Sequence, residues 1–187
     1  SRASSRRRTR TFIIVPYKAG RRYPSTSLAM SFFDMLNREC QARGLRYLVI
    51  GGHAVNAYGI ARETADVDLL VNRDDRDAWL NFFGCMEYRV FHDGGNFLQL
   101  SPPKEGAWPV DLMLVQKPTF EKMEAESRHV ALLNTTVAIP KVEHLIALKL
   151  HALKHTRLHR FLKDFLDVVN LIECAKLDAT SDEIKAL

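Results

Sequence analysis

The chain has 187 residues, of which 47% are hydrophobic, and a formal net charge of +5. This length suits one compact domain with a buried core, and no apolar run approaches the roughly 20 residues that a membrane-spanning helix needs. The three cysteines are odd in number and far apart, which argues against a disulfide framework or a zinc ribbon and favours a cytoplasmic protein.

The positive charge is concentrated at the start of the chain. Residues 1–22 contain eight lysines and arginines and no acid, so the remainder, with 19 basic and 22 acidic groups, is mildly acidic. A basic segment of this kind either contacts nucleic acid or is a solvated leader, and we favour the second interpretation for residues 1–23. We expect this leader to be disordered.

Hydrophobic periodicity and turn residues predict the elements in chain order. They are a helix from residue 28 that ends at Gly44, a strand at 46–50, a short helix at 53–58, a strand at 66–71, a helix at 74–83, a hairpin of 88–92 with 96–100, a strand at 108–115, a helix at 120–126, and a hairpin of 130–133 with 137–139. The segment 24–140 is therefore predicted to form an α+β core.

Helical spacing dominates after Pro140. Apolar residues recur at helical spacing over 142–153 and 161–171, which predicts a pair of helices packed on the core. A further helix is predicted to begin at Ser181, shortly before the sequence stops, so we expect the chain to lack its natural C-terminal end. We take 141–187 as a C-terminal helical region.

Three aspartates stand on two of the predicted strands. Asp66 and Asp68 lie two residues apart, so on a strand their side chains share one face, and Asp111 opens the strand that reaches Val115. Carboxylates crowded in this way favour a hard divalent cation between them, and Mg²⁺ prefers such oxygen ligands. The alternative is that the three acids are solvated at strand ends, because an Asp-x-Asp pair alone is common.

The residues before these acids suit a phosphate. Gly51 and Gly52 separate a strand from a helix, where glycine allows a phosphate to approach the backbone. Arg62 and Thr64 lie just before Asp66, and a guanidinium there can clamp a phosphate. Each feature alone is better explained as a tight turn or a surface charge, but all of them fall within about 20 residues.

The segment from Leu48 to Val71 resembles the core motif of the DNA polymerase β-like nucleotidyltransferase superfamily, which is a strand, a Gly-Gly or Gly-Ser pair, a short helix and Asp-x-Asp on the next strand. Its Arg-x-Thr-x-Asp-x-Asp form is most similar to the small bacterial AbiEii-type toxin branch, and more distantly to lincosamide and aminoglycoside nucleotidyltransferases. The superfamily often has a serine where this chain has Gly52 or His53. The resemblance implies a mixed sheet of about five strands flanked by helices, an NTP donor and Mg²⁺, with Asp111 as the third carboxylate.

A second part of the resemblance falls on the C-terminal helices. Lys149, then Arg157 or Arg160, then Asp164 and Asp167 resemble a helical motif of the AbiEii type. This resemblance implies that Lys149 contacts the triphosphate and that Asp164 lies near the nucleotide. His151, His155 and His159 recur every four residues, but no acid or cysteine completes a zinc site on that helix face.

These observations lead to a functional hypothesis with open alternatives. The leading hypothesis is transfer of NMP from an NTP to a hydroxyl, with Asp66, Asp68 and Asp111 holding two Mg²⁺ or Mn²⁺ ions. The acceptor is a tRNA end, a protein side chain or a small drug-like compound of the aminoglycoside or lincosamide kind, and a toxin-like enzyme acting on RNA is favoured. Whether such a toxin has an antitoxin protein as partner stays open. The alternatives are a non-catalytic nucleotide-binding module and a nucleic-acid adaptor that acts through residues 1–22.

Overall fold

The computed structural model describes residues 31–154 and 158–178. The basic leader and the helix predicted from Ser181 lie outside these residues. The centre of the fold is a mixed five-stranded sheet with strand order β1-β2-β5-β4-β3. Its strands are β1 (Tyr47–Val49), β2 (Val67–Asn72), β3 (Arg89–Asp93), β4 (Phe97–Ser101) and β5 (Val110–Val115). This arrangement confirms the predicted α+β class and the mixed sheet.

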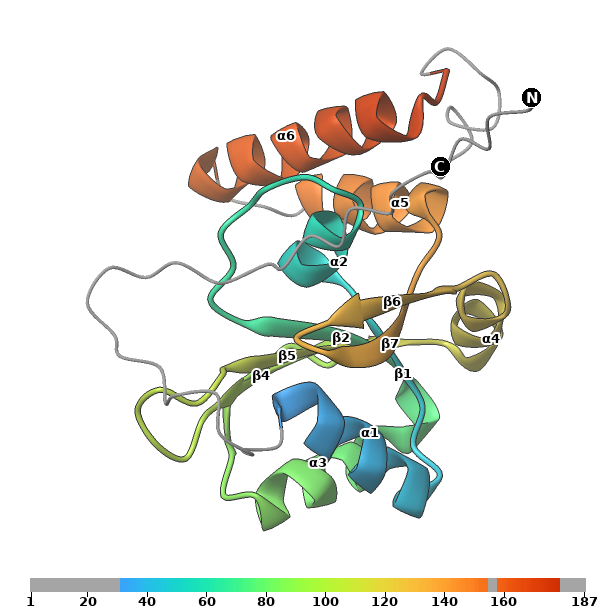
Figure 1. The fold of residues 1–187 in the computed structure, drawn as a ribbon. Helices are drawn as coiled ribbons and strands as arrows, with labels where there is room; N and C mark the ends of the chain where they lie inside the picture. The colour runs from blue at the N-terminus through green and yellow to red at the C-terminus, as the bar shows by residue number, and fades with distance from the viewer. Residues whose placement is uncertain (1–30, 155–157, 179–187) are drawn as a thin grey trace, which may run out of the picture.

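Helices cover both sides of this sheet. In Figure 1, α2, α5 and α6 lie on one side, and α1 and α3 lie on the other. The helices are α1 (Phe32–Arg43), α2 (Gly51–Ala57), α3 (Arg76–Cys85), α4 (Lys117–Ala125), α5 (Val142–Leu153) and α6 (Leu158–Ala175), with the 3-10 turn η1 (Arg73–Asp75) before α3. β6 (Arg128–Leu132) and β7 (Thr135–Ile139) form a separate two-stranded sheet.

Local signals fix the ends of α1. The Ser31 hydroxyl accepts a hydrogen bond from the Asp34 backbone N–H, and the Asp34 carboxylate accepts one from the Ser31 backbone N–H, which makes a capping box. Gly44 ends the helix with φ of 67°, a left-handed conformation in which glycine carries no steric penalty. The end predicted at Gly44 is confirmed.

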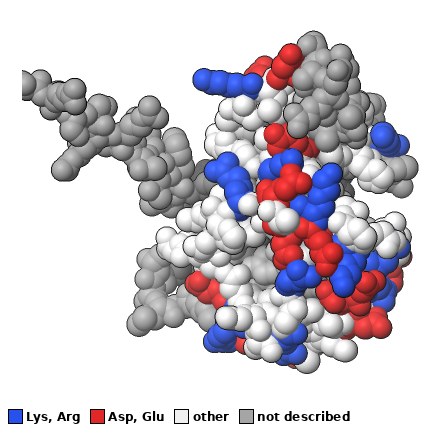
Figure 2. All heavy atoms as spheres, turned by 90° about the vertical axis from the view of Figure 1, so that its right-hand side faces the viewer, with Lys and Arg blue, Asp and Glu red and all other residues white. Residues whose placement is uncertain are grey.

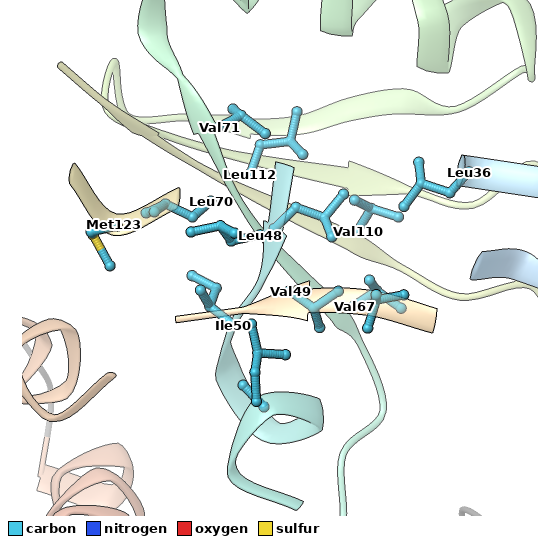
Figure 3. Packing of buried hydrophobic residues seen from close by; sticks show 14 of the residues in the cluster. Leu36, Leu48, Val49, Ile50, Val67, Leu70, Val71, Val110, Leu112 and Met123 are labelled. Atoms are coloured by element: carbon cyan, nitrogen blue, oxygen red, sulfur yellow. The ribbon is translucent and has the colours of Figure 1, made fainter. Parts of the chain in front are cut away.

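In β4 and β5, one face of the sheet is more deeply buried than the other. Leu98, Leu100, Leu112 and Leu114 are buried on that face, whereas Met113 and the alternate residues of β4 are only half-buried. Figure 3 shows Leu36 of α1 and Met123 of α4 beside the side chains of β1, β2 and β5. The half-buried side of β4 and β5 therefore remains accessible, and the candidate site lies there.

Several predicted boundaries shift by a few residues. The short helix begins at Gly51, not at His53, and Asp66 precedes β2 instead of lying in it. The first difference arises because Gly51 itself turns the chain, with φ of 60°, directly from β1 into α2. The predicted helical pair is confirmed, and α6 continues to Ala175.

Other features of the described chain agree with the composition. Cys40, Cys85 and Cys174 are all free thiols. No helix among residues 31–154 and 158–178 combines the length and the apolar character needed to cross a membrane. On the face that Figure 2 shows, acidic and basic side chains are interspersed, so this face does not carry the single-sign patch of a nucleic-acid interface. Ion pairs of the described chain include Arg46 with Glu124 and Lys117 with Glu121.

Candidate active site

The register of two parallel strands brings the predicted carboxylates together. β2 and β5 run parallel, and Asp68 is the direct register partner of Asp111, so the two side chains lie on one face of the sheet. Asp66 lies immediately before β2 and receives a hydrogen bond from Thr64 Oγ1 to its Oδ1 at 3.1 Å. Asp111 is 5% exposed, and Asp66 and Asp68 are half-buried.

The same face continues into the next strand. Gln99 of β4 is the register partner of Asp111. Its Nε2 donates to Asp111 Oδ1 at 3.3 Å and to Oδ2 at 3.2 Å. Sequence reasoning missed Gln99. Strand alternation predicts that Gln99 lies on the face of β4 away from Leu98 and Leu100. Only the pairing of β4 with β5 places it beside a carboxylate.

The carboxylates repel one another electrostatically. The pKa of Asp68 rises from its ordinary 3.8 to about 6, first because burial disfavours the charged form, and then because Asp66 and Asp111 are both negative. Lys149 and Arg62 act in the opposite direction without restoring the ordinary value. For Asp68, burial and like charge therefore outweigh the two nearby cations.

The two glycines of α2 are required by contacts with these site residues. A Cβ at Gly51 would lie 1.8 Å from Asp68 Oδ2, and a Cβ at Gly52 would lie 2.2 Å from an Arg62 guanidinium nitrogen and 2.6 Å from Thr64. Any larger residue would displace the side chains that build the site. The absence of side chains at Gly51 and Gly52 thus leaves room for Asp68, Arg62 and Thr64.

The segment after α2 is held by the helix itself. The Asn56 side chain accepts from the Arg62 N–H at 2.8 Å and donates to the Arg62 carbonyl oxygen at 2.9 Å. Asn56 is 5% exposed, so this pair of hydrogen bonds fixes the backbone of Arg62 beside the acids. Sequence reasoning missed Asn56, since a polar residue inside a short helix carries no distinguishing signal.

A buried ion-pair cluster links α5 and α6 to the same segment. Lys149 Nζ lies 2.7 Å from Asp164 Oδ1 and 2.8 Å from Asp167 Oδ2, and Arg62 Nε lies 3.2 Å from Asp167 Oδ1. Asp167 is 3% exposed and Lys149 is 9% exposed. The structure thus brings together three predicted nucleotide-binding residues, Arg62, Lys149 and Asp164, and Asp167 joins the two cations.

His53 is a buried side chain of the core. It is 6% exposed, and its ring packs edge-on against Phe33 and Trp108. Burial lowers its pKa to about 4, so the ring is neutral at pH 7. His151 is exposed, whereas His155 and His159 lie outside the side chains that the structure describes.

The donor set fits a hard divalent cation in its chemistry. Asp66, Asp68 and Asp111 offer only carboxylate oxygens, and their mutual repulsion would fall if a cation lay between them. Within residues 31–154 and 158–178, no three His, Cys, Asp or Glu side chains are already gathered as a metal site. The fit therefore rests on the donor chemistry and on the strand register.

Comparisons with known proteins identify the fold. A scan against models of known protein families gives no match, and no curated protein matches the sequence. Among solved structures, the chain is similar to the lincosamide antibiotic adenylyltransferase LnuA in its lincomycin-bound form, with 14% identity, a TM-score of 0.54 and coverage of 76% of this chain and 95% of that chain. It is also similar to the antibiotic-resistance factor ANT(2'')-Ia in solution, with 14% identity, a TM-score of 0.58 and coverage of 82% and 85%.

A third similar structure is an antigenic nucleotidyltransferase-like protein from Paracoccidioides brasiliensis, with 17% identity, a TM-score of 0.53 and coverage of 81% of each chain. At these identities the likeness concerns the fold alone. The chain has the nucleotidyltransferase fold, as the motif at 48–71 implies. These comparisons do not single out the AbiEii-type branch.

Proposed function

We propose that this protein is a Mg²⁺-dependent nucleotidyltransferase that moves an NMP from an NTP to a hydroxyl group. The observation that carries the proposal is the pairing of Asp68 with Asp111 on neighbouring parallel strands, with Asp66 beside them. Solved structures of the same fold include an adenylyltransferase and a complex of ANT(2'')-Ia with adenylyl-2''-tobramycin, which is 14% identical, with a TM-score of 0.55 and coverage of 75% of this chain and 87% of that chain.

Each residue has a role in this proposal. Asp66, Asp68 and Asp111 would hold Mg²⁺, or Mn²⁺ in its place, and two bound ions would neutralise the triphosphate and stabilise the attacking and leaving oxygens. The acceptor hydroxyl oxygen bonds to the α-phosphorus, the bond to the leaving pyrophosphate breaks, and Asp111 accepts the hydroxyl proton. Arg62 and Lys149 supply positive charge for the phosphates, while Asp164 holds Lys149 in place.

Two glycines and Thr64 complete the proposed binding site for the NTP. Gly51 and Gly52 bring α2 against Asp68, Arg62 and Thr64, so that the phosphates of the NTP would lie beside the backbone of α2 and the guanidinium. The Thr64 hydroxyl orients Asp66. A toxin-like reaction on tRNA, with an antitoxin partner, rests on the resemblance of the motif to the AbiEii type alone.

A label-transfer assay tests the proposal. The protein is incubated with Mg²⁺ and each α-³²P-labelled NTP, with total tRNA and with aminoglycoside and lincosamide acceptors in separate reactions. We expect one NTP and one acceptor class to give a labelled product, and EDTA to abolish it. The absence of labelled product with every NTP and every acceptor would refute the transfer reaction.

One observation favours a second candidate, a nucleotide-binding module without catalysis. Lys149 and Arg62 are already paired with Asp164 and Asp167, and no three-ligand metal group is preformed in the described chain. Calorimetry with ATP and Mg²⁺ on the wild type and on Asp66→Asn/Asp68→Asn separates the two candidates. Tight binding in both proteins without turnover would favour the module.

A further inference from the structure

One side of α6 runs along the segment that joins α2 to β2 (Figure 1). Two contacts define this alignment. The Cys174 thiol donates to the Tyr58 carbonyl oxygen at 3.0 Å, and Arg62 Nε lies 3.2 Å from Asp167 Oδ1. Seven residues, or about 10 Å of helix, separate the two contacts on α6, and four residues separate them on the segment. The helix and the segment therefore lie side by side and run in opposite directions.

The next residue on this side of α6 is Lys163. It precedes Asp167 by four positions, so both side chains project from the same face of the helix. This further turn of helix spans about 6 Å, which by the same spacing corresponds to about two residues of the segment beyond Arg62. The alignment therefore places Lys163 beside Thr64, next to Asp66, the first of the proposed metal-binding carboxylates.

The electrostatic surroundings of Lys163 agree with this position. The protein packed around its amino group lowers its pKa, the positive Arg62 acts in the same direction, and Asp66 and Asp167 act against them. Coulomb interactions weaken with distance, so these groups lie near the Lys163 ammonium. An anion bound there would offset both the lost hydration and the repulsion from Arg62.

Lys163 differs from the two cations that already have carboxylate partners. Lys149 is paired with Asp164 and Asp167, and Arg62 is paired with Asp167. Lys163 is exposed and takes part in none of the ion pairs found within residues 31–154 and 158–178. Its flexible stem can therefore carry the ammonium to a ligand without breaking an ion pair of the described chain.

The charge of the loaded site favours a further cation. In the proposed function three carboxylates hold two Mg²⁺ ions, and an NTP together with these carboxylates carries more negative charge than the two ions neutralise. Lys149 and Arg62 offset this excess only in part, because each shares its charge with a carboxylate of α6. Lys163 adds a positive charge on the same side of the site, where the phosphates can approach it.

We propose that Lys163 is a further substrate-binding residue, whose ammonium contacts the β- and γ-phosphates of the NTP. This inference rests on the proposed transfer of NMP, in which the α-phosphorus lies beside Asp111. Lys163 lies on the other side of the carboxylates, next to Thr64 and Asp66, where the leaving pyrophosphate would extend. Its role is to hold and orient the leaving group, and it exchanges no proton with the substrate.

Calorimetric titration of nucleotides tests this contact. The probes are ATP, GTP, CTP and UTP with Mg²⁺, and the matching monophosphates. For the NTP that the wild type binds most tightly, Lys163→Gln should raise the dissociation constant about tenfold, because a charge-assisted hydrogen bond is lost. Lys163→Arg keeps the charge and should raise it by no more than about threefold. Lys176→Gln, about 20 Å along the helix axis at the other end of α6, is the matched control and should bind like the wild type.

The monophosphate separates a direct contact from a general loss of structure. An NMP lacks the β- and γ-phosphates, so its dissociation constant, measured by displacement of the NTP, should change less than about twofold in Lys163→Gln. The midpoint of urea denaturation should be the same in Lys163→Gln and Lys176→Gln. Equal weakening of NTP and NMP binding, or an unchanged affinity for the NTP, would overturn the assignment of Lys163.

These binding measurements separate the inference from the transfer reaction. If no acceptor is labelled but Lys163→Gln weakens NTP binding and spares NMP binding, the proposed function fails and the phosphate contact stands. If label is transferred and Lys163→Gln binds the NTP like the wild type, the contact fails and the reaction stands. If the wild type binds none of the four NTPs, the contact is overturned, and the label-transfer assay alone decides the reaction.

Discussion

Two clusters of charge lie on the same side of the sheet and differ in how their charges are balanced. Lys149, Asp164, Asp167 and Arg62 pair two cations with two carboxylates inside the protein. Asp66, Asp68 and Asp111 place three carboxylates near one another, and the pKa of Asp68 is raised to about 6 by burial and by its two acidic neighbours. The proposed function assigns a divalent cation to this second cluster, whereas the first cluster pairs its charges within the fold.

The largest expected effect concerns activity. Asp111→Asn should lower NMP transfer on the order of 10³-fold, because it removes a carboxylate that holds the cation and accepts the proton. Asp74→Asn, at an exposed acid of η1, is the matched control and should retain wild-type rates. Initial rates of label transfer measure both. Equal loss in the two variants would show that charge in general, and not this position, limits the reaction.

The second effect concerns stability and falls on the balanced cluster. Asp167→Asn removes the carboxylate that bridges Lys149 and Arg62, so it should lower the free energy of unfolding by about 3 kcal/mol. Asp77→Asn breaks an ion pair of Arg76 in which the Asp77 side chain is 91% exposed, and should cost less than about 0.5 kcal/mol. Urea denaturation compares them, and similar midpoints would contradict a buried, mutually dependent cluster.

The third effect is a gain in stability, opposite in sign to the loss expected for Asp167→Asn. In metal-free protein, Asp68→Asn should raise the free energy of unfolding by roughly 1–2 kcal/mol at pH 7, because it removes a carboxylate whose charge is unfavourable in the folded state. The folded pKa of about 6 exceeds the ordinary 3.8, so the folded chain binds this proton more tightly and the contribution of Asp68 to stability falls as pH rises between these values. The gap between variant and wild type should therefore widen from about pH 4 to about pH 6.

Denaturation of both proteins in EDTA across that range checks the sign. A gap that narrows with rising pH, or a variant less stable than the wild type at pH 7, would mean that the Asp68 carboxylate is already compensated in the fold.

The smallest effect concerns Gln99. Gln99→Leu removes the two hydrogen bonds that orient the Asp111 carboxylate, so kcat/KM should fall about three- to tenfold. Gln99→Asn keeps an amide at the position and should restore part of the loss. Initial rates of label transfer measure both variants, and an unchanged kcat/KM in Gln99→Leu would reduce Gln99 to a packing residue.

The sequence predicts the carboxylates of the site more fully than their surroundings. Asp66, Asp68 and Asp111 follow from strand alternation and from the motif at 48–71, because those signals are local. The positions of Gln99 and of Phe91, the bulge residue of β3, depend on how β3, β4 and β5 pair. A short window of sequence predicts neither the register of a strand pair nor the position of a bulge.

The glycines show a different limit of sequence reasoning. A Gly-Gly pair after a strand indicates close approach, but not what approaches. In the structure the atoms that require Gly51 and Gly52 belong to Asp68, Arg62 and Thr64. These residues lie 10 to 17 positions along the chain from the glycines, and only the folded loop brings them back. The predicted boundary at His53 was wrong for the same reason, since the turn into α2 is made by Gly51.

The most direct measurement is a calorimetric titration of Mg²⁺ into the protein saturated with a non-hydrolysable ATP analogue. The account predicts metal binding in the wild type and in Asp74→Asn, and weakening of at least tenfold in Asp111→Asn. Equal affinity and stoichiometry in all three proteins would contradict it, because the cation would then be bound without the carboxylate pair of β2 and β5.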